Sequence, residues 1–364
     1  MSRRLLILIG VGLIAIAAAF AWRLWRAQAT RRADLNTALF DAIESGDAKA
    51  VKALLDEGAS VNAVDPDWGT PLHDAAGKGD VAIAKLLIAR GADVNARTKD
   101  AASDWTPLHS ASAFGHLKMV QLLVDHGADV NANTPHFSTP LACAAAAGRQ
   151  RIVEFLVSKG ADINLGGIVS GTTPLLMAAG HDQIETAKWL LDHGADPNAA
   201  SAYGSTPLSM AAGHENDEMI DLLLARGAQY TLHVAVSRGD LAKVEELLSR
   251  GADPNARDEQ ERTPLFCAVS KDQVAVAKAL IAAGADAKAE YRSAGGLLGY
   301  AAWLGSEEMT RVLVEAGADV NTRNRGQFDM TPLDVALQHK HDKVAEILRA
   351  HGGKTSQELR GSTQ

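Results

Sequence analysis

The stretch Thr106 to Gly127, TPLHSASAFGHLKMVQLLVDHG, holds the pattern that decides the fold. Its threonine is a good helix N-cap, and Pro107 suits the first helical position, where a missing N–H costs nothing. A first helix of about two turns ends at Gly115, and a second helix ends at Gly127. Helices this short are marginal on their own in water, so each unit must stack on its neighbours.

The same unit recurs along most of the chain. Thr-Pro-Leu begins at Thr70, Thr106, Thr139, Thr173, Thr206, Thr263 and Thr331, and each threonine is followed by a glycine 21 residues later. Three further glycines at this spacing have degenerate starts, at Thr37, Tyr230 and Gly296. The sequence therefore predicts a repeat array of ten units, because stacked units bury one continuous core.

These units resemble the ankyrin repeat. The resemblance is carried by TPLH at 70–73 and 106–109 and by GADVN at 91–95, 127–131 and 317–321, and it covers about residues 35–352. It implies an all-α repeat solenoid, an ankyrin repeat array of about ten helix pairs joined by β-hairpin fingers. It also implies that the array binds proteins through the fingers and the concave face of the first helices.

Several positions depart from this pattern. The glycine between the two helices is replaced by Asp182, Glu215, Asp272 and Lys340, where a left-handed backbone is less comfortable. Only residues 228–229 remain where one finger should be, and the capping Thr-Pro is absent at Tyr230 and Gly296. We therefore expect a break in the row of fingers and lower stability after it. The polar tail, residues 353–364, is expected to be disordered.

The N-terminal segment predicts a membrane anchor. Leu5 to Trp22, LLILIGVGLIAIAAAFAW, is an uncharged apolar run long enough to span a bilayer as a helix. Arginines precede it, and Trp-Arg pairs follow it where a membrane interface would lie. Residues 1–34 are thus interpreted as one transmembrane helix, at about 5–22, and a tether. Extended, the 12 residues from Arg23 to Asp34 would reach at most about 40 Å.

A cleaved signal peptide is the alternative for this segment. Residues 19–21 and 27–29 both have the small-x-small form of a cleavage site. Cleavage would release a secreted or periplasmic protein, whereas the length of the apolar run favours an anchor. With an anchor, two arginines precede the span and four follow it, which favours a single-pass protein with its array on the cytoplasmic side.

The charge of the body argues against nucleic acid as a partner. From Asp34 onward the chain carries 44 acidic and 30 basic side chains, a formal charge of -14. Binding to a phosphate backbone needs a basic surface instead.

No pattern indicates a catalytic, cofactor or metal site. Cys143 and Cys267 have no CxxC or Cys/His cluster beside them and are expected in the core. His73, His109 and His233 hold the fourth position of the unit, where a structural hydrogen bond beneath the finger is expected. The remaining histidine groups, His181 with His214 and His339 with His341, are interpreted as solvated. An enzyme with a site in the groove is the rival function, but nucleotide, hydrolase and zinc-protease motifs are absent. We expect no cofactor and no small-molecule substrate.

Large apolar residues that the repeat core does not need mark the expected contact surface. They are Trp68, Trp105, Phe137 and Tyr203 in finger segments, Phe114 in a turn facing the groove, and Trp303 with Leu304 in the matching turn of the ninth unit. The alternative for each ring is packing against an adjacent finger. The expected function is a protein–protein interaction scaffold or adaptor tethered to a membrane.

Overall fold

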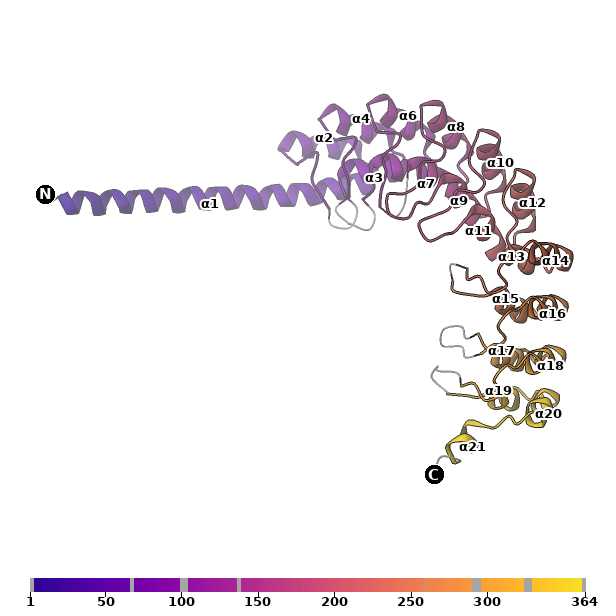
Figure 1. Ribbon diagram of the computed structural model, residues 1–364. Helices are drawn as coiled ribbons and strands as arrows, with labels where there is room; N and C mark the ends of the chain where they lie inside the picture. The colour runs from indigo at the N-terminus through magenta and orange to yellow at the C-terminus, as the bar shows by residue number, and fades with distance from the viewer. Residues whose placement is uncertain are drawn as a thin grey trace. The chain divides into compact units, whose positions relative to one another are not determined.

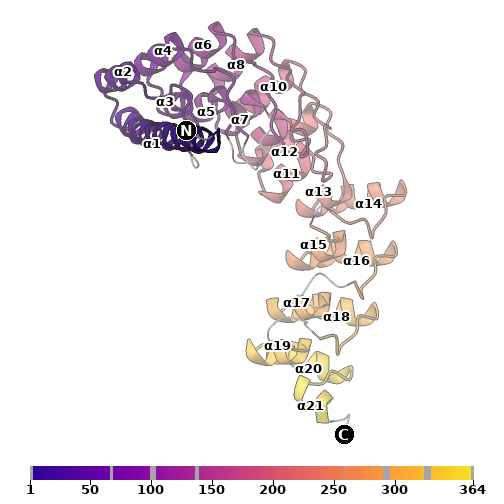
Figure 2. The same ribbon diagram turned by 90° about the vertical axis from the view of Figure 1, so that its left-hand side faces the viewer.

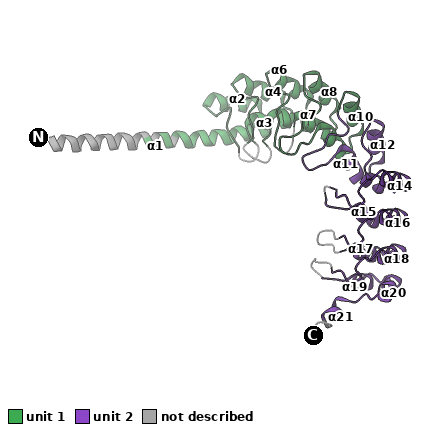
Figure 3. Ribbon diagram, viewed as in Figure 1, with its two compact units in different colours: residues 1–195 green, residues 196–364 purple. Residues whose placement is uncertain are grey.

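The computed structural model describes residues 3–65, 69–98, 104–135, 139–258, 260–289, 296–323 and 329–361, without the side chains of residues 3–21, 24, 27 and 361. The chain divides into two compact units, residues 1–195 and residues 196–364 (Figures 1 and 3). Each unit is a row of short helices in which every first helix is followed by a second one.

In the first unit one long helix precedes the short ones. The helices are α1 (Arg3–Glu44), α2 (Ala48–Glu57), α3 (Pro71–Lys78), α4 (Val81–Ala89), α5 (Pro107–Phe114), α6 (Leu117–Asp125), α7 (Pro140–Ala146), α8 (Gln150–Ser158), α9 (Pro174–Gly180) and α10 (Ile184–Asp192). Helices α3, α5, α7 and α9 contact one another in order, and α2, α4, α6, α8 and α10 form a second layer (Figure 2).

The second unit repeats this arrangement. Its helices are α11 (Pro207–Gly213), α12 (Asp217–Ala225), α13 (Leu232–Ser237), α14 (Leu241–Ser249), α15 (Pro264–Ser270), α16 (Val274–Ala282), α17 (Leu297–Leu304), α18 (Glu307–Glu315), α19 (Pro332–Gln338), α20 (Asp342–Ala350) and α21 (Ser356–Gly361). The all-helical repeat array that the sequence predicts is therefore present in both units.

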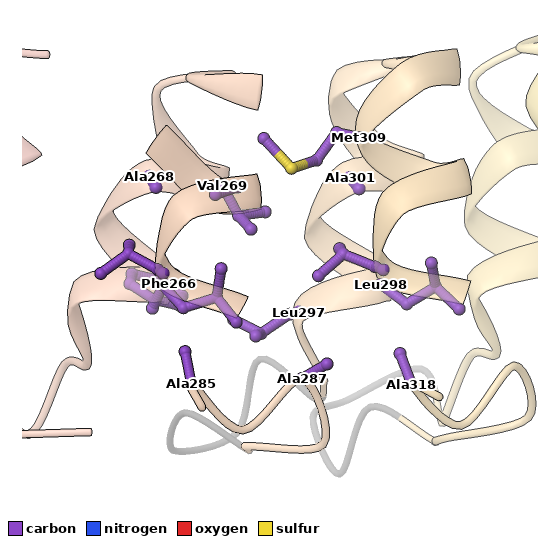
Figure 4. Close-up of a cluster of buried hydrophobic side chains, with 14 of the residues drawn as sticks. Phe266, Ala268, Val269, Ala285, Ala287, Leu297, Leu298, Ala301, Met309 and Ala318 are labelled. Carbon is purple, nitrogen blue, oxygen red and sulfur yellow. The ribbon is translucent and has the colours of Figure 1, made fainter. Parts of the chain in front are cut away.

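The core of each unit consists of apolar side chains that neighbouring helix pairs share. In the second unit Phe266 and Val269 of α15, Leu297 and Ala301 of α17, and Met309 of α18 belong to one buried cluster (Figure 4). Alanines between the larger side chains let adjacent first helices approach closely. No helix pair encloses this core alone, which is why the short helices are stable only as a stack.

The fourth-position histidines support the fingers as predicted. The Thr70 backbone N–H donates to His73 Nδ1 over 3.1 Å, so the ring proton lies on Nε2, which donates to the Trp105 carbonyl at 3.0 Å. His233 Nε2 reaches the Arg262 carbonyl in the same way, also at 3.0 Å. Each ring thus connects a first helix to the next finger along the chain.

The turn between the two helices of a pair keeps its left-handed backbone even without glycine. Asp182, Glu215, Asp272 and Lys340 have φ values of 57°, 57°, 52° and 60°. The turn is therefore imposed by the hydrogen bonds that end the first helix. At a non-glycine residue this conformation costs on the order of 1 kcal/mol.

At several helix pairs, the residue that follows the turn between the two helices has one of two roles. Asp80, Asp240 and Ser306 cap their own second helix through the side chain. His116 and His341 do not cap; instead their rings lie 2.9 Å from the carbonyls of Gly77 and Ala302 in the preceding pair. His341 is thus engaged with its neighbour and not simply solvated as predicted.

These reaching side chains pass directly over the turn glycine of the preceding pair. A Cβ on Gly79 would lie 2.5 Å from His116, and one on Gly305 would lie 2.8 Å from His341. At these two positions glycine is needed because a side chain would collide with the ring, and also because φ is positive. By contrast, the non-glycine turn at Asp272 is followed by a pair whose Ser306 caps its own helix.

Asparagines in the Gly-Ala-Asp-x-Asn turns clip most pairs to the next, a role that the sequence analysis missed. Asn95 Nδ2 donates to the Gly127 carbonyl at 3.0 Å, and its Oδ1 accepts the Asp129 N–H at 2.9 Å. The Asp93 carboxylate accepts the Asn95 N–H and holds this asparagine in place. The same pair of bonds is made by Asn62, Asn131, Asn198, Asn255 and Asn321. We call this two-bond contact the asparagine clip.

The expected β-hairpins are not present as strands in the described residues, where isolated bridges occur between Asp65 and Gly69 and at Thr134 and Gly296. The fingers close instead through one or two backbone bonds, such as Thr98 N–H to the Trp105 carbonyl at 2.9 Å. A β-ladder needs successive pairs of backbone hydrogen bonds between two strands. Backbone amides near the fingers donate instead to aspartate side chains, as the Asn95 N–H does.

At the missing finger the chain passes almost directly from one pair to the next. The Gly227 carbonyl still accepts a hydrogen bond from Asn198 Nδ2, at 3.0 Å, and α13 begins shortly afterwards at Leu232. Thr231 takes the N-cap place and accepts the Val234 N–H, so the cap expected to be absent at Tyr230 is supplied one residue later. At Gly296 no side chain caps α17, as predicted.

The long helix α1 absorbs the predicted tether and the first helix of the array. Residues 23–34 are helical and rise about 18 Å, less than half of their extended reach. Thr37 caps nothing; its hydroxyl donates to the Ala33 carbonyl, because Ala38 stands where proline would force a helix start. Side chains up to residue 21 lie outside the described residues. In the part of the chain that the structure describes, no helix has the length and apolar character needed to cross a bilayer.

The tail also differs from the expected disorder. Helix α21 begins after Thr355, whose N–H donates to Glu358 at 2.7 Å. The Ser356 N–H donates to the Asp334 carboxylate of α19 at 2.8 Å, and Arg349 pairs with Glu358 at 2.9 Å. These polar contacts hold a segment that has almost no apolar side chains to bury.

Candidate functional site

The structure exposes three of the predicted contact residues. Phe114, Tyr203 and Trp303 expose 58%, 67% and 50% of their surface, far more than core side chains do. Trp68 and Phe137 lie outside the described residues.

Two other predicted contact residues are held by the fold. Trp105 is half-buried, and its ring stacks on His109 with 6.1 Å between ring centroids. Its backbone N–H donates to the Thr98 hydroxyl at 2.9 Å. Leu304 is also half-buried, at the end of α17. Trp105 therefore has a packing role in its finger, the alternative that the sequence left open.

Phe114 forms one wall of a groove in the first unit, which we call the α3–α5 groove. The groove has a volume of about 340 Å³ and is lined by Glu44, His73, Asp74, Gly77, Lys78, Ser110 and Phe114. A Cβ built on Gly77 would lie 3.7 Å from the Phe114 ring, so the ring packs over the backbone of α3. The aromatic face is thus fixed in place while more than half of it meets solvent.

The floor of the α3–α5 groove is acidic. Burial, together with the negative charges of Asp65 and Glu44, raises the pKa of Asp74 to about 6, against the opposing positive charge of Lys78. The Lys78 ammonium instead donates to the Glu44 carbonyl at 2.9 Å. A cation brought in by a partner would lower the energy of the Asp74 carboxylate, and it would also meet the negative face of the Phe114 ring.

Trp303 borders a separate pocket in the second unit, which we call the α17–α19 pocket. It has a volume of about 290 Å³ and is lined by Gly296, Gly299, Tyr300, Trp303, Thr322, Met330, Pro332, Val335, Gln338 and His339. Tyr300 and Trp303 meet edge to face at 5.6 Å, and Trp303 and His339 do so at 6.5 Å. None of the described residues that line it is Asp, Glu, Lys or Arg, in contrast to the acidic α3–α5 groove.

A third hollow, of about 360 Å³, opens between α11, α13 and α15, beside the place of the missing finger. Its charged side chains pair with one another: Arg262 with Asp258 at 2.7 Å and Lys271 with Glu215 at 2.8 Å. Burial raises the pKa of the Cys267 thiol, also in this hollow, to about 11, so it stays protonated at neutral pH. The hollow therefore offers no thiolate nucleophile.

The remaining sequence candidates show no convergence on a site. Cys143 is buried in α7 as predicted, and burial raises the pKa of its thiol to about 12. His181 Nδ1 lies 2.9 Å from the Met177 carbonyl of its own helix. Among the described residues, no three His, Cys, Asp or Glu side chains group closely enough to hold a metal ion.

Sequence reasoning missed three surface features. Ile168 and Val169 form an exposed aliphatic finger tip, and Leu337 is exposed near the α17–α19 pocket. An apolar pair between glycines, GGIVSG, could have revealed the finger tip. The raised pKa of Asp74 had no sequence signal, because it depends first on burial in the fold and then on Asp65 and Glu44 from other segments.

The comparison with protein families agrees with this architecture. The family model described as "Ankyrin repeats (3 copies)" matches four consecutive stretches, residues 17–98, 96–167, 166–231 and 232–324. Together they cover well over half of the chain. In the comparison with curated proteins, none matches this chain.

Proposed function

Because the chain belongs to the ankyrin repeat family, we propose that it is an interaction scaffold that captures a partner protein and holds it beside a membrane. Ankyrin repeats generally bind other proteins and are generally not catalytic. This role fits the α3–α5 groove, whose aromatic wall and acidic floor suit a protein surface better than a small substrate.

The observation that carries the proposal is the exposed Phe114 ring fixed beside Asp74 and Glu44. An aromatic side chain of this kind is typical of the residues that dominate binding energy. The acidic groups select for a partner segment that carries Lys or Arg. The scaffold is therefore proposed to bind a basic segment of a protein, with one cation over the Phe114 ring.

Crosslinking in cells, with Phe114→Ala compared to the unchanged chain, tests this proposal. We expect at least tenfold less partner captured and a nearly unchanged melting temperature, because the ring is exposed. Phe155→Ala is the matched control, since Phe155 is a half-buried aromatic residue on the second helix α8. Equal capture by the two variants would remove Phe114 from the site.

A triple variant in which Trp105, Phe114 and Phe137 are all replaced by alanine would be less informative. Trp105 stacks on His109 and supports its finger, so its replacement by alanine lowers stability in addition to any loss of binding. Phe114→Ala separates the two effects.

Membrane attachment is the second part of the proposal. It is supported by the apolar run of residues 5–22 and by Trp22 and Trp25, both exposed on α1, with the Arg26 guanidinium 5.3 Å from the Trp22 ring. Such aromatic and basic residues suit a membrane interface. The proposed arrangement is a single-pass protein with its array on the cytoplasmic side.

Fractionation combined with mass spectrometry of the mature N-terminus tests the attachment. We expect the full-length chain in the membrane fraction, resistant to alkaline washing. A chain that begins near residue 22 or 30 and is secreted or periplasmic would indicate a cleaved leader instead. Full-length soluble protein with residues 1–34 intact would exclude an anchor.

A further inference from the structure

Helix α17 lacks two side chains that occupy the space beneath the finger in other pairs. Gly296 stands at the N-cap, where other first helices have threonine, and Gly299 stands at the fourth position, where α3 has His73. A Cβ on Gly299 would have no atom of the described residues within 4 Å, so among these residues the position faces open space. That space is part of the α17–α19 pocket.

Histidines at the equivalent position of two other first helices show one way in which this space is filled. In α3 and α13 a planar ring fills it and donates one N–H to the carbonyl of the residue just before the next threonine or its equivalent. Those carbonyls belong to Trp105 and Arg262. The corresponding residue facing α17 is Met330, which lines the pocket. No side chain of the described residues donates to its carbonyl.

The walls of the pocket favour a larger ring than imidazole. Tyr300, Trp303 and His339 present rings at steep angles to one another, and Pro332 and Val335 add aliphatic surface. Trp303 exposes half of its surface, so the site is open to solvent. An aromatic guest can stack edge to face with these rings, a contact worth more than its buried area alone.

We propose that the α17–α19 pocket binds the indole ring of a tryptophan from the partner protein, with the indole N–H donating to the Met330 carbonyl. The ring takes the place of the absent histidine and restores its hydrogen bond. The inference deepens the proposed scaffold function and rests on it. A tryptophan within a polypeptide is specified, because none of the lining residues that the structure describes carries a charge to pair with the ammonium and carboxylate of a free amino acid.

Titration of the unchanged protein with N-acetyl-tryptophanamide, followed by NMR, tests the pocket. We expect saturable binding, and at least fivefold weaker binding of the analogue methylated on the indole nitrogen, because one hydrogen bond is lost. Free tryptophan should also bind more weakly. Absence of saturable binding, or equal binding of the methylated analogue, would overturn the proposal.

Two variants at one position locate the binding. Gly299→His copies the ring of α3, so it should fill the pocket and abolish N-acetyl-tryptophanamide binding while keeping or raising the melting temperature. Gly299→Ala is the matched control, because its Cβ enters open space; it should retain binding within about twofold. Binding retained by the histidine variant would place the ligand elsewhere and contradict the assignment.

This test is independent of partner capture through Phe114, which lies in the other unit. If the unchanged protein captured its partner but did not bind N-acetyl-tryptophanamide, the pocket proposal would be wrong and the scaffold function would stand. If instead the unchanged protein captured no partner but still bound N-acetyl-tryptophanamide, the scaffold function would be wrong and the pocket would stand.

Discussion

The two units share one kind of apolar core but differ in how their helix pairs are clipped together. In the first unit asparagine side chains reach the next turn at successive pairs, from Asn62 to Asn164. In the second unit the clip is missing twice, because Thr231 stands at the asparagine position after Gly227 and Lys288 stands at the one after Gly284. Apolar burial brings pairs together in both units, whereas polar clips add to the energy of each interface. Since the stability of a repeat array is a sum of unit and interface terms, the second unit should open first.

The largest expected effect comes from removing clips in the first unit. Asn95→Ala together with Asn131→Ala deletes four inter-pair hydrogen bonds, at about 0.5–1 kcal/mol each. We expect a loss of about 2–4 kcal/mol by urea unfolding, with hydrogen exchange accelerated between α4 and α8. A change below about 0.5 kcal/mol would mean that the clips contribute nothing beyond apolar packing.

Restoring a clip in the second unit is the converse experiment. Lys288→Asn supplies both an amide donor for the Gly317 carbonyl and an acceptor for the Asp319 N–H, which lysine cannot do. We expect a gain of about 1–2 kcal/mol and slower exchange in α18 and α20. Lys288→Ala is the control that removes the lysine without adding a clip; an equal gain in both variants would point to the lost charge.

Asp74 is a destabilising element inside the better-clipped unit. Its pKa is raised to about 6 from 3.8, first by burial, so the folded state holds this proton more tightly than the unfolded chain. The resulting stability is complete below pH 3.8 and is lost as the pH rises through 6. Asp74→Asn should therefore raise the free energy of unfolding at pH 7.5 by on the order of 1 kcal/mol, after allowing for partial solvent screening, and change it little at pH 4. An equal gain at both pH values would show that the charge is not responsible.

The smallest effect concerns a left-handed turn in the second unit. Asp272→Gly relieves a φ of 52° but makes the unfolded chain more flexible. We expect a net gain of about 0.5 kcal/mol, measured by thermal unfolding, which narrows the difference between the units. The reverse change, Gly305→Asp, should lower the stability by considerably more than Asp272→Gly raises it, because His341 occupies the space of the new Cβ.

Local chemistry made much of the fold predictable. Thr-Pro starts a first helix wherever both residues are present, and the fourth-position histidine bonds the next finger at His73 and His233. Where one residue of a motif was missing, prediction failed. Without proline after Thr37 the helix α1 runs through, and Thr231 caps α13 although the motif at Tyr230 had seemed lost.

The candidate sites were less predictable, since they depend on residues far apart in the sequence. The raised pKa of Asp74 arises first from burial in the fold and then from Asp65 and Glu44 on other segments. Counting aromatic residues could not separate Phe114, which is exposed, from Trp105, which stacks on a histidine. The α17–α19 pocket is marked by the glycine at 299, an absent side chain that a search for functional groups passes over.

The side chains that reach back over turn glycines restrict how such an array can evolve. A junction between two repeats is a matched pair of positions, such as Gly79 with His116 or Gly305 with His341. If a duplication placed a copy of the repeat containing His116 behind Asp272, the ring would collide with the aspartate Cβ. Repeats of this chain are therefore not freely interchangeable modules: gain, loss or shuffling of a repeat succeeds only where the new neighbours have compatible junction residues.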